Sequence, residues 1–138
     1  MRRNYSTGRP LEAQIGFSRA VRIGNVIEVS GTAPTAPDGS TIAPGDAYAQ
    51  AKAMFEIIGR ALAELGGSLQ DVVRTRMFLT NADDWQAVGR AHGEIFADVR
   101  PAATMLEISR LLNSEWLVEI EATAVVGEAQ RRRGREPP

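Results

Sequence analysis

Three glutamates near the C-terminus are the side chains best suited to chemistry in this chain. Glu107 belongs to the segment 103–108, and Glu119 and Glu121 belong to the segment 118–124. Both segments alternate with the period of a β-strand, which places residues two apart on the same face of a sheet. We therefore expect all three carboxylates on one sheet face. Acidic residues are disfavoured in strands, so this face needs basic partners or a ligand.

The same alternation divides the other residues of 103–108 between the two faces. Thr104 and Leu106 are expected in the core. Ala103 and Met105 are expected on the face that carries the carboxylates.

Upstream, periodicity and turn signals predict the elements that must position these strands. Gly24-Asn25 suits a hairpin turn, Asp46 suits a helix N-cap, and Gly66 suits a helix end. The predicted elements are strands over 15–22 and 26–31, a helix over 46–65, a strand over 71–80, and a helix from Asp83 or Asp84 to about 97. With the two C-terminal strands the order is β-β-α-β-α-β-β, an α+β fold.

Composition restricts the classes of function. The formal net charge of −1 gives no overall attraction to nucleic acid or to an anionic membrane. The chain has no cysteine and a single histidine, so we expect no disulfide, no thiolate nucleophile, no metal site and no cofactor. The N-terminal residues lack the apolar run of a signal peptide, and no segment is long enough to span a membrane. We expect a cytoplasmic protein.

Length and the C-terminal composition predict the domain organisation. A chain of 138 residues can form one hydrophobic core, and we assign a single domain to residues 1–127. Residues 128–138 are polar and contain four arginines, so we expect a disordered tail.

Four sequence blocks, in order, resemble the Rid family, also called YjgF-type proteins. They are G-N-V-I-E-V-S-G-T at 24–32, Q-A-K-A at 50–53, D-V-V-R-T-R-M-F-L-T at 71–80, and R-P-A-A-T-M-L-E-I from 100 with V-E-I-E-A-T-A-V from 118. The resemblance covers about residues 14–127. The best-understood branch of this family consists of reactive enamine and imine deaminases.

The resemblance implies a fold and an assembly. The fold is a chorismate-mutase-like mixed sheet with both helices on one face. Three copies pack their open faces around a threefold axis as a homotrimer, with ligand clefts between subunits. Family topology and strand parity put Arg74, Arg76 and Phe78 on this open face, where one arginine at least is expected to pair with Glu119 or Glu121.

The resemblance also implies site residues, and this chain departs from some of them. Glu119 matches the family glutamate that holds the attacking water. The family arginine that binds the substrate carboxylate corresponds to Ala103, which places the chain in an arginine-lacking branch. A family tyrosine corresponds to Phe17, and a family asparagine falls on Gly89. The substrate-binding positions expected from the resemblance are Phe17, Ser30, Gly31, Thr32, Ala103, Thr104 and Met105.

Another arginine could replace the missing anchor. Arg76 is the first candidate, because the family topology places its strand between the strands of Ala103 and Glu119. The alternative for Arg76 is an ion pair with Glu119 or Glu121, and this is the interpretation we prefer. Arg19 is the second candidate anchor. We expect an arginine near Glu119 to keep that carboxylate ionised.

Three functions fit the sequence. The first is a trimeric hydrolytic deaminase that acts on an enamine, an imine or a related small electrophile other than the usual amino-acid-derived ones, with an anionic ligand. The second is a trimer that binds a metabolite without catalysis. The third is an RNA-directed activity, which the near-neutral charge disfavours.

Overall fold

The computed structural model describes residues 1–127; the tail predicted over 128–138 lies outside the described residues. The elements in chain order are β1 (Arg2–Tyr5), α1 (Pro10–Ile15), β2 (Ala20–Ile23), β3 (Val26–Thr32), α2 (Ala47–Glu64), β4 (Val72–Leu79), α3 (Trp85–Phe96), β5 (Ala102–Glu107) and β6 (Val118–Val125). Short 3₁₀ turns precede β4 and α3.

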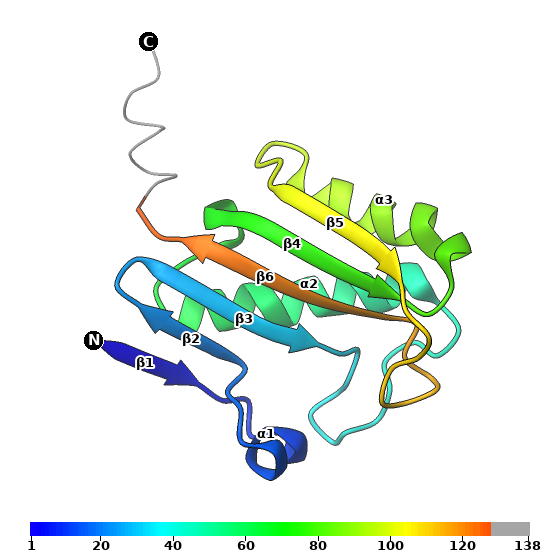
Figure 1. Cartoon of the computed structure of the whole chain (residues 1–138), viewed down its shortest axis with the longest axis horizontal. Helices are drawn as coiled ribbons and strands as arrows, with labels where there is room; N and C mark the ends of the chain where they lie inside the picture. The colour runs from blue at the N-terminus through cyan, green and yellow to red at the C-terminus, as the bar shows by residue number, and fades with distance from the viewer. Residues whose placement is uncertain (128–138) are drawn as a thin grey trace.

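One mixed sheet organises the chain (Figure 1). The strand order is β1-β2-β3-β6-β4-β5, in which β4 and β5 run parallel and every other neighbouring pair is antiparallel. Helices α2 and α3 cover one face of this sheet, and α1 lies beside its lower edge in Figure 1. The predicted α+β fold, with two helices on one face, is confirmed. The position of β4 between β6 and β5 is confirmed as well.

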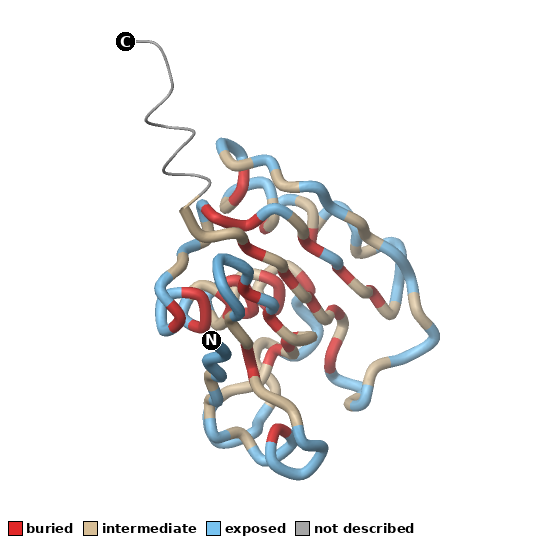
Figure 2. The backbone as a smooth tube through the Cα atoms, turned by 60° about the vertical axis from the view of Figure 1, so that its left-hand side comes forward, coloured by how far each residue is buried: buried red, intermediate tan, exposed pale blue. Residues whose placement is uncertain are grey.

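The core lies between the sheet and α2, where the buried positions concentrate (Figure 2). The face of α2 that meets the sheet is buried, and Met54, Phe55 and Ile58 are fully enclosed. The Asp46 side chain caps this helix by accepting a hydrogen bond from the Ala49 backbone N–H at 3.0 Å. Gly66 follows the helix with φ of 84°, a conformation that favours glycine.

The N-terminal region differs from the prediction of a strand over 15–22. Pro10 begins the short helix α1, and Gly16 ends it in the left-handed region at φ of 90°. The strand that follows is shorter and begins only at Ala20. An additional strand, β1, pairs with β2 at the edge of the sheet.

The register of β5 overturns one assignment of faces. Met105 pairs with Met77 and Glu107 pairs with Leu79, so both lie on the face covered by helices. Glu107 is therefore not with the other two carboxylates; it accepts a hydrogen bond from the Ala82 backbone N–H at 2.7 Å. Ala103 pairs with the buried Thr75 and so also lies on the helix-covered side, whereas Thr104 and Leu106 lie on the open face. Polar and apolar residues occur at both parities of this edge strand, so its own alternation does not fix its orientation.

The open face carries the remaining predicted charges. Arg76 pairs with Glu121 and Phe78 pairs with Glu119 across the β4–β6 ladder, as strand parity requires. The residues between them, such as Met77 and Ile120, are buried beneath the helices.

Candidate functional site

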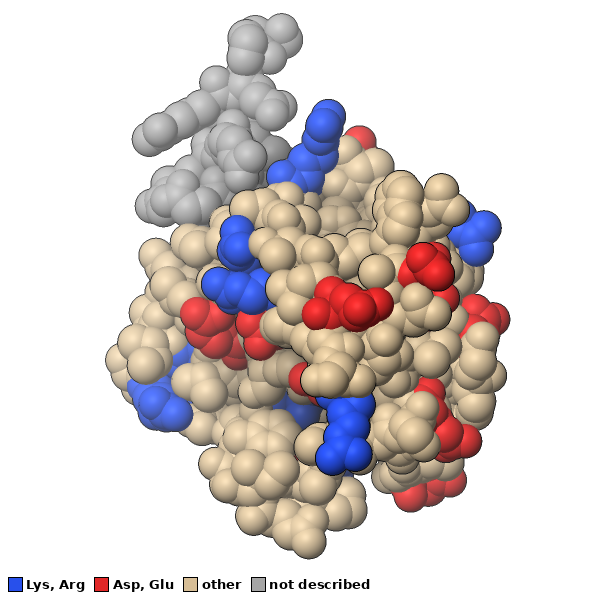
Figure 3. Space-filling model, turned by 45° about the vertical axis from the view of Figure 1, so that its right-hand side comes forward, with Lys and Arg blue, Asp and Glu red and all other residues tan. Residues whose placement is uncertain are grey.

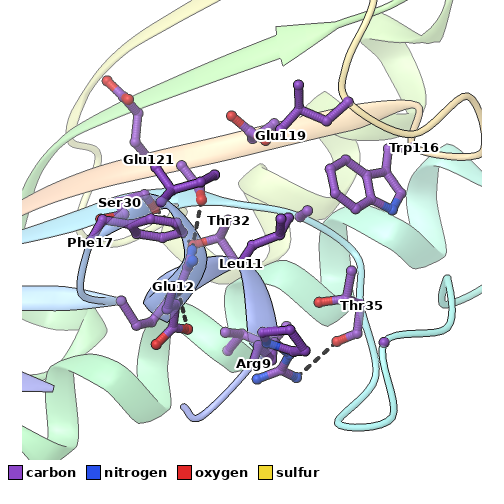
Figure 4. Close-up of a pocket in the computed structure, with 18 residues that line it drawn as sticks. Arg9, Leu11, Glu12, Phe17, Ser30, Thr32, Thr35, Trp116, Glu119 and Glu121 are labelled. Atoms are coloured by element: carbon purple, nitrogen blue, oxygen red, sulfur yellow. Dashed lines mark hydrogen bonds and ion pairs between the residues drawn. The ribbon is translucent and has the colours of Figure 1, made fainter. Parts of the chain in front are cut away.

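A cavity of about 680 Å³ lies between α1, the end of β3 and the strand β6 (Figure 4). Residues from the segment before β6 and from the loop after β3 complete its wall. Five predicted site residues other than Arg19 line it: Phe17, Ser30, Gly31, Thr32 and Glu119. Trp116 lies at one end of the view and Phe17 at the other, with Glu119 between them.

Glu119 is positioned by an unusually close approach to the backbone of β3. A Cβ atom at Gly31 would lie 2.6 Å from Oε2 of Glu119, so only glycine leaves room for the carboxylate in this position. The register of β3 against β6 shifts between Val29 and Thr32, which is where this contact occurs.

Burial raises the pKa of the Glu119 carboxyl above its ordinary value, the positive charge of Arg19 opposes this change, and the negative charge of Glu121 adds to it. Arg19 thus lowers the pKa of Glu119, as expected of a nearby arginine, and the ionised state of this carboxylate stays a prediction. Loss of water contact outweighs the attraction of Arg19. A carboxyl with a raised pKa exchanges protons more readily near neutral pH.

Arg19 is buried in the cavity wall, and its partners are well defined. Its Nε lies 3.5 Å from Oε2 of Glu12, while Nη1 donates to the Gly31 carbonyl at 2.6 Å and to Oγ1 of Thr32 at 3.1 Å. Its guanidinium carbon lies 5.2 Å from the centre of the Phe17 ring. Burial lowers the pKa of Arg19, and the charge of Glu12 opposes that change.

Glu12 fixes this arginine and the N-terminal segment together. Its carboxylate accepts hydrogen bonds from Oγ of Ser6 at 2.6 Å and from the Thr7 backbone N–H at 3.0 Å, as well as from the Thr7 hydroxyl. Burial alone would raise the pKa of Glu12, but these hydrogen bonds and Arg19 outweigh it, so the pKa is lowered. Arg9 connects the N-terminal segment to the loop after β3, because its Nη2 donates a hydrogen bond to the Thr35 carbonyl at 2.8 Å.

Arg76 lies away from this cavity. Its Nη1 is 3.3 Å from Oε1 of Glu121 on the open face, where it lines a separate shallow hollow. Of the two interpretations of Arg76, the geometry matches the preferred ion pair, with Glu121 as the partner. The neighbouring Arg74 donates to Oγ1 of Thr104 at 2.8 Å.

The three predicted site residues of β5 do not reach the cavity within one chain. Ala103, Thr104 and Met105 lie on the edge strand, and β4 separates β5 from the strand of Glu119. A single chain therefore brings together Glu119, Arg19, Phe17 and the turn at 30–32 without these three residues.

His92 has a structural role. Its Nε2 lies 2.9 Å from Oγ1 of Thr75, and its ring packs against Phe55 and Phe96. Burial lowers the pKa of this histidine, which favours the neutral ring. Within residues 1–127, no group of three or more histidine, cysteine or acidic side chains is placed to hold a metal ion. In the same part of the chain, no helix is both long and apolar enough to cross a membrane.

Sequence analysis missed the cavity residues supplied by the N-terminal segment and by the loop before β6. They are Arg9, Leu11 and Glu12 from the former, and Leu112 and Trp116 from the latter. Pro10 and Gly16 bracket α1 in the manner of a first-turn proline and a C-terminal glycine, so a signal for this helix was present. The loop before β6 has no comparable signal.

Comparison with known proteins identifies relatives along nearly the whole chain. Residues 7–126 match the family model described as Endoribonuclease L-PSP. The chain is 40% identical over 126 residues to the uncharacterized protein SCO2049 of Streptomyces coelicolor, which covers 91% of this chain and 92% of that protein. It is 33% identical over 107 residues to the 3-aminoacrylate deaminase RutC of Acinetobacter baylyi, over 78% of this chain and 84% of RutC.

A solved structure shares the fold. Rv2704 of Mycobacterium tuberculosis, a member of the YjgF/YER057c/UK114 family, matches with a TM-score of 0.83 at 38% identity. The match covers 91% of this chain and 100% of the Rv2704 chain. With its sheet order, its helices on one face and these relatives, the chain belongs to the Endoribonuclease L-PSP family, which is the YjgF or Rid family.

Proposed function

We propose that this chain is a cytoplasmic homotrimer that hydrolyses a small reactive enamine or imine, with Glu119 as the catalytic residue. The observation that carries this proposal is the half-buried carboxylate of Glu119, which has a raised pKa and lies in a cavity of about 680 Å³. Similarity to a 3-aminoacrylate deaminase, at 33% identity, supports the same class of reaction.

The reaction needs one group that can take up and return a proton. The reacting form is the protonated imine, which an enamine forms by taking up a proton from solvent at its β-carbon. As the oxygen of a water molecule bonds to the imine carbon, the C=N π pair moves onto nitrogen and Glu119 accepts a proton from the water. The carboxyl then returns that proton to nitrogen. As the C–N bond breaks, its electron pair leaves with ammonia, the hydroxyl oxygen forms the carbonyl, and the hydroxyl proton passes to Glu119 and from it to the ammonia. Protonated imine and water thus give a carbonyl compound and ammonium.

Arg19 is the better candidate for the anionic end of the substrate. Its Nε and Nη1 hold Glu12 and the Gly31–Thr32 turn, and no residue among 1–127 takes a hydrogen bond from its Nη2. Arg76 pairs with Glu121 and does not itself line the cavity. In the proposed trimer, Ala103, Thr104 and Met105 of a neighbouring subunit close the cleft, and their edge strand carries no anchoring cation.

The assembly is tested by sedimentation. The open sheet face carries Arg76, Phe78, Glu119 and Glu121, a mixture of apolar and charged groups that a trimer would cover. We expect a trimer at micromolar concentration. A monomer at that concentration would remove the inter-subunit cleft from the proposal.

The chemistry is tested by Glu119→Gln, which keeps the shape of the side chain and removes its charge. We expect kcat to fall about 10²- to 10⁴-fold on imines generated in situ by an amino-acid oxidase. Glu28→Gln is the matched control, because Glu28 lies on the same open sheet face, opposite Thr123, and does not line the cavity. Full activity of Glu119→Gln, with the assembly intact, would contradict the catalytic role.

A metabolite-binding trimer without catalysis is the second candidate. It is favoured by Ala103, because loss of a charged anchor weakens positioning for hydrolysis. It predicts ligand binding in the same cavity and no turnover of any imine. An RNA-directed activity is supported less, since basic and acidic side chains intermix on the face shown in Figure 3 and the net charge is −1.

A further inference from the structure

The wall of the cavity beside Glu119 is largely apolar. Helix α1 contributes Leu11 and Ile15, and the segment before β6 contributes Leu112 and Trp116. The Phe17 ring forms the opposite end in Figure 4. These residues surround a space within the size range of sites for drug-sized ligands, and a three-carbon enamine would leave much of it to water.

Three apolar side chains at the rim of the cavity are exposed to solvent. Leu112 is 79% exposed, Ile15 is 62% exposed and Leu11 is 39% exposed. Single exposed apolar side chains are ordinary, but these three border one cavity. A cluster of exposed apolar side chains beside a functional carboxylate is typical of a binding site in which the ligand buries that apolar surface.

The charges around the cavity are largely neutralised by one another. Glu12 pairs with Arg19 and Arg76 pairs with Glu121, which leaves Glu119 and Arg9 as the lining charges without an ion-pair partner among residues 1–127. A protonated imine is a small cation, so its positive charge can lie against the carboxylate of Glu119. The carboxylate of an imino acid faces Arg19, as proposed above, and its side chain meets apolar residues, so selection among side chains comes mainly from buried apolar area.

We propose that the cavity selects imines that carry a bulky apolar side chain, aromatic or branched aliphatic, over the imines of small amino acids. This inference rests on the proposed function, because it assigns the substrate class of the same site. The imine carbon lies beside Glu119, and the side chain lies against Leu11, Leu112 and Trp116.

The test compares imines formed in situ by an amino-acid oxidase from phenylalanine, leucine and alanine. We expect kcat/KM for the phenylalanine- and leucine-derived imines to exceed that for the alanine-derived imine by about tenfold or more, since each buried methylene contributes to selection. Leu112→Ala and Leu11→Ala should each lower kcat/KM about three- to tenfold for the phenylalanine-derived imine. Each should change it less than about twofold for the alanine-derived imine.

A control variant separates this selection from a general loss of apolar surface. Ile23→Ala removes an exposed apolar side chain from β2 that does not line the cavity. It should leave both kcat/KM values unchanged. Equal effects of Leu112→Ala and Ile23→Ala, or equal use of the three imines, would overturn the inference.

A binding measurement distinguishes failure of the selection from failure of the deaminase function. Phenylpyruvate and pyruvate, the hydrolysis products of the phenylalanine- and alanine-derived imines, are titrated into the protein and their binding is measured by calorimetry. Phenylpyruvate should bind at least about tenfold more tightly. If it does, and Leu112→Ala weakens it while no imine is hydrolysed, the selection holds and the deaminase function is wrong. If Leu112→Ala instead dissociates the assembly in sedimentation, the apolar rim is a subunit contact and the inference is wrong.

Discussion

Two arginine–glutamate pairs in this chain have nearly the same separation and very different surroundings. Arg19 and Glu12 lie 3.5 Å apart with side chains 8% and 3% exposed. Arg76 and Glu121 lie 3.3 Å apart with side chains 45% and 35% exposed. The distance between the charges therefore says little about how much a pair contributes to stability. Burial of the pair and its other hydrogen bonds determine that contribution.

The buried pair joins three segments that lie apart in the sequence. Glu12 gathers the N-terminal loop through Ser6 and Thr7, and Arg19 continues the connection to the carbonyl of Gly31. The cavity wall near Glu119 thus depends on one carboxylate in α1. The exposed pair connects only two adjacent strands, which the β4–β6 ladder already holds.

Glu12→Ala should have the largest effect on stability. It leaves Arg19 buried without its counter-charge and removes the acceptor of Ser6 and Thr7, so we expect a loss of about 3–5 kcal/mol in the free energy of unfolding. Urea denaturation measures it, with Glu121→Ala as the matched control on the open face. Similar losses for the two variants would contradict the contrast between the pairs.

Acid pH should weaken the buried pair in a defined direction. The folded pKa of Glu12 lies below its ordinary value of 4.5, so its stabilising contribution is complete above that pH and is lost as pH falls through the folded pKa. Unfolding measured from neutral to acid pH should therefore show a steeper fall for the wild type than for Glu12→Gln. Parallel curves would mean that folding does not lower the pKa of Glu12.

Gly31→Ala should have an effect of intermediate size, and it should lower activity more than stability. Its new Cβ would meet the Glu119 carboxylate at 2.6 Å, so we expect that carboxylate to move and kcat to fall about 10- to 100-fold. Gly93→Ala is the matched control, because a Cβ there meets nothing within 4 Å and the position is helical. The control should keep full activity and gain up to about 1 kcal/mol in stability.

The smallest effect is expected for the exposed pair. A double-mutant cycle with Arg76→Ala and Glu121→Ala should give a coupling of about 0.5 kcal/mol that declines with added salt. The same cycle with Arg19→Ala and Glu12→Ala should give a coupling several times larger. A coupling above about 2 kcal/mol for Arg76 and Glu121 would show that water is excluded from this pair.

Sequence analysis predicted the framework well, because its signals were local. Asp46, Gly66 and the Gly24-Asn25 turn each set an element boundary, and family blocks located Glu119 beside Phe17 and the turn at 30–32. The cavity brings these residues together as expected, while their roles in binding and catalysis stay predictions.

The wrong face assigned to Glu107 and the unpredicted rise in the pKa of Glu119 have identifiable physical causes. The orientation of β5 depends on its ladder with β4, which the mixed pattern of 103–108 could not specify, and Glu107 was consequently put on the wrong face. The direction of the Glu119 pKa depends on how much water the folded chain removes from the carboxyl, and that quantity is absent from a sequence. Both depend on contacts between segments far apart in the chain.

The two edges of the sheet differ in how they resist self-association. Strand β1 presents Arg2 and Arg3, so a second copy approaching this edge meets like charges. Strand β5 at the other edge reads Ala-Ala-Thr-Met-Leu-Glu and has a single charge at its end. Since uncharged apolar edges are the ones that add further strands, aggregation of chains that have dissociated from the proposed trimer should begin at β5. A lysine at position 103 would oppose it.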